Sequence, residues 1–142
     1  MTQIRYDKNM EQFDLSQKSN EQISVIVVDD SDFTRKNIIR FLQSKSFNVV
    51  ADFNHPKAAL EYLAAHNTHI ALVDVVMPDI SGIELTQKIC SNISRTKVIL
   101  MSSLVQERIV LESIAAGALD FLPKPINEQH LEDSILRIMK DS

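Results

Sequence analysis

The chain alternates between short apolar runs and segments with helical spacing, and this alternation limits its fold more than any other feature. The first run, residues 23–28, is rich in valine and isoleucine and is followed by a pair of aspartates. Comparable runs occur at residues 48–51, 70–73, 98–101 and 121–122. Apolar runs of this kind are typical of strands that are buried on both faces of a parallel sheet.

Between and after these runs, apolar residues recur every three or four positions, as on the buried face of a helix. The five expected faces contain Ile38, Ile39 and Leu42; Leu60, Leu63 and Ala64; Leu85, Ile89 and Ile93; Val105, Ile109, Val110 and Ile114; and Leu131, Ile135, Ile138 and Met139. Pro56 suits the first turn of the second helix, Gly117 the left-handed end of the fourth, and Asn127 the N-cap of the fifth. The sequence therefore predicts an α/β fold, a doubly wound five-stranded parallel sheet with five helices.

The length of 142 residues, 44% of them hydrophobic, fits one domain with a core that needs no disulfide or metal. We expect this domain to cover residues 23–142. Residues 1–22 are polar, with apolar side chains scattered among amides and charges. They predict a flexible or partly helical N-terminal extension, with a docking peptide as the alternative.

Several classes of protein are disfavoured by what the chain lacks. Its two glycines, Gly82 and Gly117, lie too far apart for a glycine-rich nucleotide loop. A net charge of −4, with no basic cluster longer than Arg35-Lys36, argues against nucleic acid as a partner. The single cysteine, Cys90, excludes an intramolecular disulfide and predicts a buried, inert thiol. With no apolar leader or membrane span, we expect a cytoplasmic protein that does not bind membranes.

Polar side chains follow four of the five predicted strands. Asp29 and Asp30 follow the first, Asp74 the third, Ser102 ends the fourth and Lys124 follows the fifth. In an open parallel sheet, ligands bind outside the carboxyl ends of the strands. Each residue alone has an ordinary explanation, such as a turn, a helix cap or a solvated side chain, and one of the two adjacent aspartates could cap the next helix. Their joint occurrence at strand ends predicts a functional site.

The residue types in this predicted site indicate a particular chemistry. Clustered carboxylates repel one another and need a cation at neutral pH. Oxygen ligands without histidine or cysteine favour Mg²⁺ or Mn²⁺. A cation, the ammonium of Lys124 and the hydroxyl of Ser102 could together bind a phosphoryl group that transfers onto Asp74, the expected nucleophile.

At this point the sequence resembles a known family, the receiver domains of two-component response regulators. The resemblance covers about residues 23–140 and extends to stand-alone, CheY-like members with a flavodoxin-like fold. The residues that carry it are Asp29-Asp30, Asp74, Met77-Pro78-Asp79, Gly82, Ser102, Gly117-Ala118 and Lys124-Pro125.

The resemblance implies a role for each site residue. Asp74 matches the phosphoacceptor, Asp30 the carboxylate that binds Mg²⁺ directly, and Asp29 the carboxylate that acts through a water. The backbone carbonyl of Val76 matches a third metal ligand from the protein, and Lys124 the lysine that pairs with the phosphoryl group.

Two further residues match the conformational switch of the family. Ser102 corresponds to the hydroxyl that moves to the phosphoryl group, and Phe121 to the aromatic ring that then turns inward. Lys124–Pro125 matches a peptide bond that is typically cis. We also expect Gly82 to adopt a positive φ in the loop after Asp74.

One departure from the family pattern has mechanistic content. Val76 and Leu104 stand where side chains flank the water that hydrolyses the phospho-aspartate, and both are apolar. Neither can orient a water by hydrogen bonding. We therefore expect a long-lived phospho-aspartate.

The resemblance predicts a phosphorelay protein that is not an enzyme, although it catalyses its own phosphorylation from the donor and its own slow dephosphorylation. The donor would be a histidine kinase or a histidine phosphotransfer protein. Because the chain stops soon after the fifth helix, we expect output through an unidentified protein target or a homodimer, using the surface of the fourth helix, fifth strand and fifth helix. Three alternatives remain: a phosphorylation-independent interaction module, a flavodoxin-like electron carrier and a haloacid-dehalogenase-type phosphatase. The last two fit the adjacent aspartates poorly.

Overall fold

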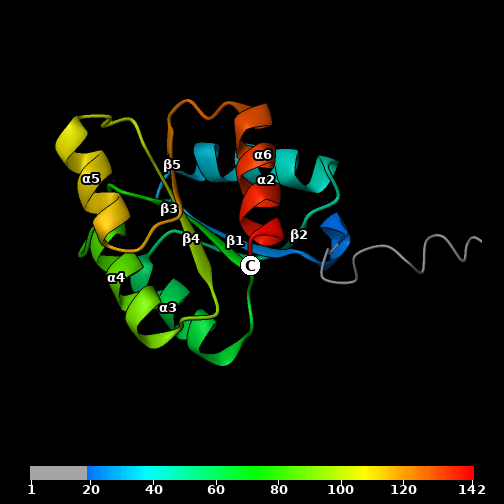
Figure 1. Cartoon of the computed structure of the whole chain (residues 1–142), viewed down its shortest axis with the longest axis horizontal. Helices are drawn as coiled ribbons and strands as arrows, with labels where there is room; N and C mark the ends of the chain where they lie inside the picture. Colours follow the sequence, from blue (N-terminus) through cyan, green and yellow to red (C-terminus); the bar gives the residue numbers. More distant parts are fainter. Residues whose placement is uncertain (1–18) are drawn as a thin grey trace, which may run out of the picture.

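The computed structural model of the chain describes residues 19–142 (Figure 1). The elements are η1 (Asn20–Gln22), β1 (Ser24–Val28), α2 (Asp32–Ser44), β2 (Asn48–Phe53), α3 (Pro56–Ala65), β3 (Ile70–Asp74), α4 (Gly82–Asn92), β4 (Lys97–Ser102), α5 (Glu107–Ala115), β5 (Asp120–Pro123) and α6 (Glu128–Lys140). Most of the predicted N-terminal extension, residues 1–18, lies outside the described residues. Within the described part, no helix is long and apolar enough to cross a membrane.

The five strands form one parallel sheet in the order β2-β1-β3-β4-β5, so the predicted fold class is confirmed. β1 and β3 pair directly, with Val25 opposite Ile70 and Val28 opposite Val73. The chain leaves β1 toward one edge of the sheet and leaves β3 toward the other. The carboxyl ends of these two strands therefore border the place where ligands bind in doubly wound folds.

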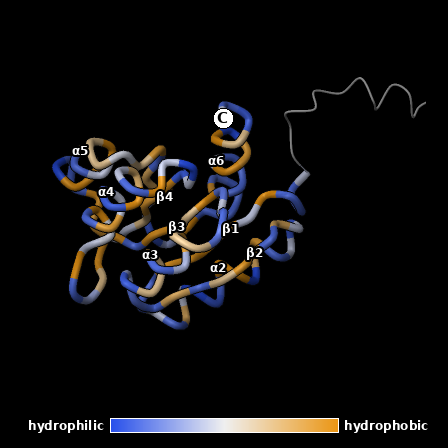
Figure 2. The backbone as a smooth tube through the Cα atoms, turned by 90° about the horizontal axis from the view of Figure 1, so that it is seen from below, coloured by the Kyte–Doolittle hydropathy of each residue, from blue (hydrophilic) through white to orange (hydrophobic). Residues whose placement is uncertain are grey.

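Helices cover both faces of the sheet, and alternate strand residues point to opposite faces. Val25 and Val27 belong to a core cluster that includes side chains of α2 and α6, such as Leu42 and Ile135. Ile26 and Val28, their neighbours in β1, belong to the cluster that includes side chains of α3 and α4. In Figure 1, α2 and α6 lie on the upper right side of the sheet, and α3, α4 and α5 lie on its lower left side. Figure 2 shows the matching alternation of hydrophobic and hydrophilic stretches along the helices.

Burial differs between central and edge strands. Every residue of β3 is buried, as the sequence predicts. In β2, however, exposed residues alternate with half-buried ones, and Val50 is 37% exposed. The prediction of burial on both faces was wrong here because β2 is an edge strand.

The expected apolar faces of two helices also need correction. Ser113 is the buried residue of α5, whereas Ile114 is 49% exposed and Val105 precedes the helix. Ala64, expected on the buried face of α3, is exposed. Helical spacing alone does not show which apolar residues meet the sheet, because the orientation of a helix depends on its neighbours.

The predicted ends of the helices largely agree with the structure. Pro56 begins α3, Gly117 has a φ of +114° after α5, and Asn127 caps α6 by accepting a hydrogen bond from the N–H of His130. Gly82 does not have a positive φ, so that prediction was wrong. Gly82 begins α4, and a Cβ at this position would lie 2.0 Å from the carbonyl oxygen of Asp74. The close approach of two backbones, not dihedral freedom, requires glycine here.

Candidate functional site

Three carboxylates meet at the carboxyl ends of β1 and β3. Asp29 and Asp30 follow β1, and Asp74 ends β3. One carboxylate oxygen from each residue lies within 4.8 Å of the other two. Asp29 and Asp74 are buried and Asp30 is exposed, so the cluster opens to solvent on the side of Asp30. The convergence predicted from the strand ends is therefore present.

Lys124 reaches this cluster from the segment after β5. Its Nζ lies 2.7 Å from Asp29 Oδ2 and 3.3 Å from Asp74 Oδ2. The N–H of Lys124 donates to the carbonyl oxygen of Ser102, which ties the lysine backbone to the end of β4. The Lys124–Pro125 peptide bond is cis, as the resemblance implies. The predicted lysine thus lies between two of the predicted carboxylates.

Burial and neighbouring charges shift the pKa values of Asp74 and Lys124. Burial raises the pKa of Asp74 above its ordinary value, and the neighbouring charge of Asp29 adds to the effect. The ammonium of Lys124 and the N–H of Val76 oppose this rise without cancelling it. For Lys124, burial acts to lower the pKa. The hydrogen bond to Asp29 and the charge of Asp74 outweigh it, so the pKa of the ammonium is raised and its charge is held.

The loop after β3 folds closely against Asp74. The N–H of Val76 donates to the carboxyl of Asp74, and the N–H of Gly82 donates to the carbonyl oxygen of Val75 over 2.7 Å. Asp79 adopts a left-handed φ of 70°, and its carboxylate lies 2.6 Å from His55 Nε2. The backbone carbonyl of Val76 stays a predicted metal ligand.

Two residues that sequence reasoning missed hold the loop after β1. Ser31, not Asp29 or Asp30, caps α2, and its own N–H donates to Asp29 Oδ1 over 2.9 Å. Arg35 of α2 is buried and donates to the backbone carbonyl oxygen of Asp29 over 2.7 Å. The serine followed by an aspartate was an available helix-start signal. No sequence signal identified the contact of Arg35.

The two predicted switch residues lie on β4 and β5. Ser102 is fully buried, and its hydroxyl accepts a hydrogen bond from the N–H of Leu104 over 2.9 Å. Phe121 is half-buried and packs against the cluster that contains Leu100, its register partner on β4. Ser102 thereby contacts the segment that leads into α5. Their switching role is a prediction.

Val76 and Leu104 are exposed, at 54% and 44%, in the loops that follow β3 and β4. Solvent therefore reaches both positions.

A groove of about 770 Å³ lies alongside α2. It is bordered by Phe33, Ser103 and Lys124 but by none of the three carboxylates. Lys124 borders this groove and also contacts Asp29 and Asp74, so the groove adjoins the acidic cluster.

The donor set fits a hard divalent cation. Three carboxylates and one ammonium leave two formal negative charges when all are ionised, and the ligand atoms are oxygens, which Mg²⁺ prefers. The exposure of Asp30 leaves room for the waters that Mg²⁺ retains. Asp29, Asp30 and Asp74 are the residues that could hold the ion.

A family model for the response regulator receiver domain matches residues 25–136. The chain therefore belongs to the receiver family, the class of domain found in phosphorelay response regulators, as the sequence predicted. It is similar to the chemotaxis protein CheY of Bacillus subtilis, with 30% identity over 111 residues that cover 78% of this chain and 92% of that protein.

Other relatives and solved structures are similar over the same region. The receiver domain of NarL from Mycobacterium tuberculosis has a TM-score of 0.79 and 31% identity, covering 84% of this chain and 98% of that one. A CheX–CheY complex with BeF3 and Mg from Borrelia burgdorferi has a TM-score of 0.78 and 27% identity, covering 82% and 88% of the two chains. A cyclic di-GMP phosphodiesterase of Thermotoga maritima is 33% identical over 119 residues, which are 84% of this chain but 32% of that protein.

Proposed function

We propose that this receiver accepts a phosphoryl group on Asp74, with Mg²⁺ or Mn²⁺ bound by Asp29, Asp30 and Asp74, from a histidine kinase or a histidine phosphotransfer protein. The observation that carries the proposal is the convergence of three carboxylate oxygens within 4.8 Å of one another. The ammonium of Lys124, 3.3 Å from the acceptor carboxylate, supports it. The solved CheX–CheY complex, which includes BeF3 and Mg, supports the same chemistry in a relative.

In the transfer step, a carboxylate oxygen of Asp74 forms a bond to phosphorus while the bond from phosphorus to the donor imidazole nitrogen breaks. The electron pair of that bond stays on the nitrogen. Lys124 is close enough to Asp74 to donate to an oxygen of the incoming phosphoryl group. A divalent cation, when bound, supplies positive charge that offsets the phosphoryl oxygens.

The switch begins at the hydroxyl of Ser102. In the present structure this hydroxyl accepts from the N–H of Leu104. Turning the hydroxyl toward a phosphoryl group on Asp74 breaks that hydrogen bond and releases the segment before α5. The ring of Phe121 then turns inward, and phosphorylation shifts the population between two states.

The output surface is formed by α5, β5 and α6. It carries exposed apolar side chains on and after α5, with Leu111 at 60%, Ile114 at 49% and Leu119 at 49% exposure. Exposed apolar side chains of this kind are suited to a protein partner. We propose that phosphorylation changes the affinity of this surface for a target protein or for a second copy of the chain.

The test is Mg²⁺-dependent labelling by acetyl phosphate, read by intact mass and by elution volume in size-exclusion chromatography. We expect the wild-type chain to gain one phosphoryl group and Asp74→Asn to gain none. Asp133→Asn is the matched control, because Asp133 is an exposed aspartate of α6 whose carboxylate accepts a hydrogen bond from the side chain of Gln129. Labelling of Asp74→Asn, or of neither protein, would contradict the proposal. Unlabelled wild-type protein would favour a phosphorylation-independent interaction module.

A further inference from the structure

Arg35 is a buried charge that phosphoryl transfer does not explain. Its side chain is 11% exposed, and each of its three nitrogens donates to a different residue. Nε donates to Asp52 Oδ2 over 2.6 Å, Nη2 to Asp32 Oδ1 over 2.6 Å, and Nη1 to the carbonyl oxygen of Asp29 over 2.7 Å. The guanidinium keeps its charge at any working pH, so all three bonds are charge-assisted.

The bond to Asp29 acts on the backbone of the candidate metal site. The N–H of Asp29 donates to the carbonyl oxygen of Phe53 in β2, and its carbonyl oxygen accepts from Arg35. Both backbone groups of Asp29 are therefore held, one by the edge strand and one by α2. The carbonyl group that Arg35 holds belongs to the peptide unit that joins Asp29 to Asp30, the two adjacent carboxylates of the site.

The other two bonds fix the guanidinium itself. Asp52 lies on β2, one residue before Phe53, and Asp32 is the first residue of α2. These carboxylates are largely open to solvent, with side-chain exposures of 43% and 70%, so as surface ion pairs they would contribute little stability. Their effect is mainly geometric. They fix the plane of the guanidinium group, so that Nη1 points at the carbonyl oxygen of Asp29.

We propose that Arg35 is a positioning residue for the metal site, holding the backbone of Asp29 so that the carboxylates of Asp29 and Asp30 are correctly placed for a divalent cation. This inference rests on the proposed function, because it assumes that the cation binds there. Residues that orient metal ligands typically change metal affinity by roughly 10- to 100-fold when replaced. A lysine cannot replace the three-way contact, because its ammonium is one point of charge.

The experiment measures the affinity of the full chain for Mg²⁺ by isothermal titration calorimetry. We expect Arg35→Gln to weaken binding at least about tenfold and Arg35→Lys to restore little of the loss. Arg108→Gln is the matched control, because Arg108 forms an exposed ion pair with Glu112 on α5, away from the carboxylates. We expect its affinity to equal that of the wild type.

Urea unfolding in EDTA separates positioning from folding. A merely structural arginine would lower the unfolding free energy but leave the affinity of the folded chain unchanged. Asp52→Asn, at a more exposed position, gives a second measurement of Mg²⁺ affinity if Arg35→Gln fails to fold. We expect Asp52→Asn to weaken Mg²⁺ binding by a smaller factor than Arg35→Gln. In the double variant, we expect no loss of affinity beyond that of Arg35→Gln alone.

The outcomes distinguish the two proposals. If the wild-type chain binds Mg²⁺ and the folded Arg35→Gln and Asp52→Asn variants bind it equally well, the positioning role is overturned while the proposed function stands. If Arg35→Lys binds as tightly as the wild type, charge rather than geometry is responsible, which also overturns it. If the wild-type chain does not bind Mg²⁺, the proposed function fails first.

Discussion

Lys124 donates a hydrogen bond to Asp29, with 2.7 Å between Nζ and Oδ2. Its distance to Asp74 is longer, at 3.3 Å. In this structure the lysine is therefore paired more closely with a candidate metal ligand than with the proposed phosphoacceptor. A cation bound by Asp29 would offset the charge that attracts the lysine and leave its ammonium available to the phosphoryl group.

Replacing Lys124 by methionine should destabilise the metal-free chain, because it leaves buried carboxylates without their counter-charge. Removing one partner of a buried ion pair costs about 3 kcal/mol. Urea unfolding in EDTA measures the loss, and a repeat with Mg²⁺ should recover part of it, since the cation supplies the missing charge. Lys140→Met, an exposed position at the end of α6, is the control. If Lys124→Met loses the same unfolding free energy with and without Mg²⁺, the cation does not replace the charge of Lys124.

The raised pKa of Asp74 predicts how stability depends on pH. The folded chain binds this proton more tightly than the unfolded chain does, so stability falls as pH rises from the ordinary value of 3.8 through the raised pKa. Asp74→Asn removes the ionised group. The variant should be more stable than the wild type at pH 7 in EDTA, and the difference should disappear below the ordinary pKa.

Urea unfolding across this pH range tests the effect, with Asp133→Asn as the exposed control. A stability difference for Asp74→Asn that does not change with pH would show that the effect comes from packing and not from ionisation.

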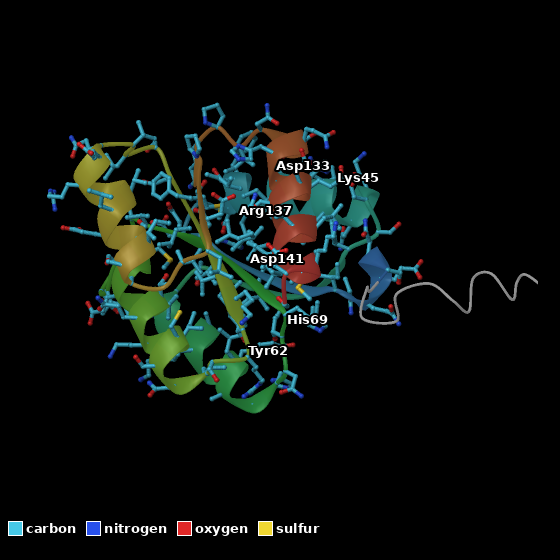
Figure 3. All side chains as sticks on the ribbon, viewed as in Figure 1. Lys45, Tyr62, His69, Asp133, Arg137 and Asp141 are labelled. Atoms are coloured by element: carbon cyan, nitrogen blue, oxygen red, sulfur yellow. The ribbon has the colours of Figure 1, made fainter. Side chains whose placement is uncertain are left out.

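Asp120 has the opposite shift. Burial acts to raise its pKa, but hydrogen bonds from Ser134, the N–H of Phe121 and Arg137 outweigh burial and lower it. Asp120 thereby ties the start of β5 to α6, where Arg137 is labelled in Figure 3. Its contribution is present above the ordinary value of 3.8 and is lost as pH falls through the lowered pKa.

Asp120→Asn should therefore cost about 1 kcal/mol at neutral pH, since hydrogen bonds to a charged but partly solvated group are lost. The cost should shrink in acid. Thermal unfolding at pH 7 and pH 3 measures it, and an unchanged difference at the two pH values would refute the role of charge.

Val76→Asn should shorten the lifetime of the phospho-aspartate. The wild-type side chain is apolar and 54% exposed, so it cannot orient an attacking water, whereas an amide can. The rate of loss of the phosphoryl group, followed by intact mass after removal of acetyl phosphate, should increase severalfold. Val105→Asn, at a similarly exposed valine before α5, is the control. A wild-type half-life of seconds would contradict the expectation of slow hydrolysis.

The sheet and most of the site could be predicted because both depend on patterns close in sequence. The carboxyl ends of parallel strands lie at one edge, so knowing where the first and third strands end was enough to bring Asp29 and Asp74 together. The fully buried β3 has the simplest sequence pattern, and it was predicted correctly.

The parts that could not be predicted depend on contacts between distant segments. The ion pair of Arg35 with Asp52 spans 17 positions and crosses from a helix to an edge strand. The need for Gly82 arises from the carbonyl oxygen of Asp74, which approaches only after α4 packs on the sheet. Periodicity describes one element at a time, so it records neither contact.

The small number of buried side chains on α5 has an energetic consequence for signalling. Ser113 is the residue that this helix buries, whereas α2 buries Arg35, Ile38, Phe41 and Leu42. Free energy of transfer grows with the apolar area removed from water, so we expect that shifting α5 costs less than shifting α2. A pair of conformations separated by a few kcal/mol can be inverted by the charge of one phosphoryl group. The helix with the least to lose on moving is thus the one that lies on the proposed output surface.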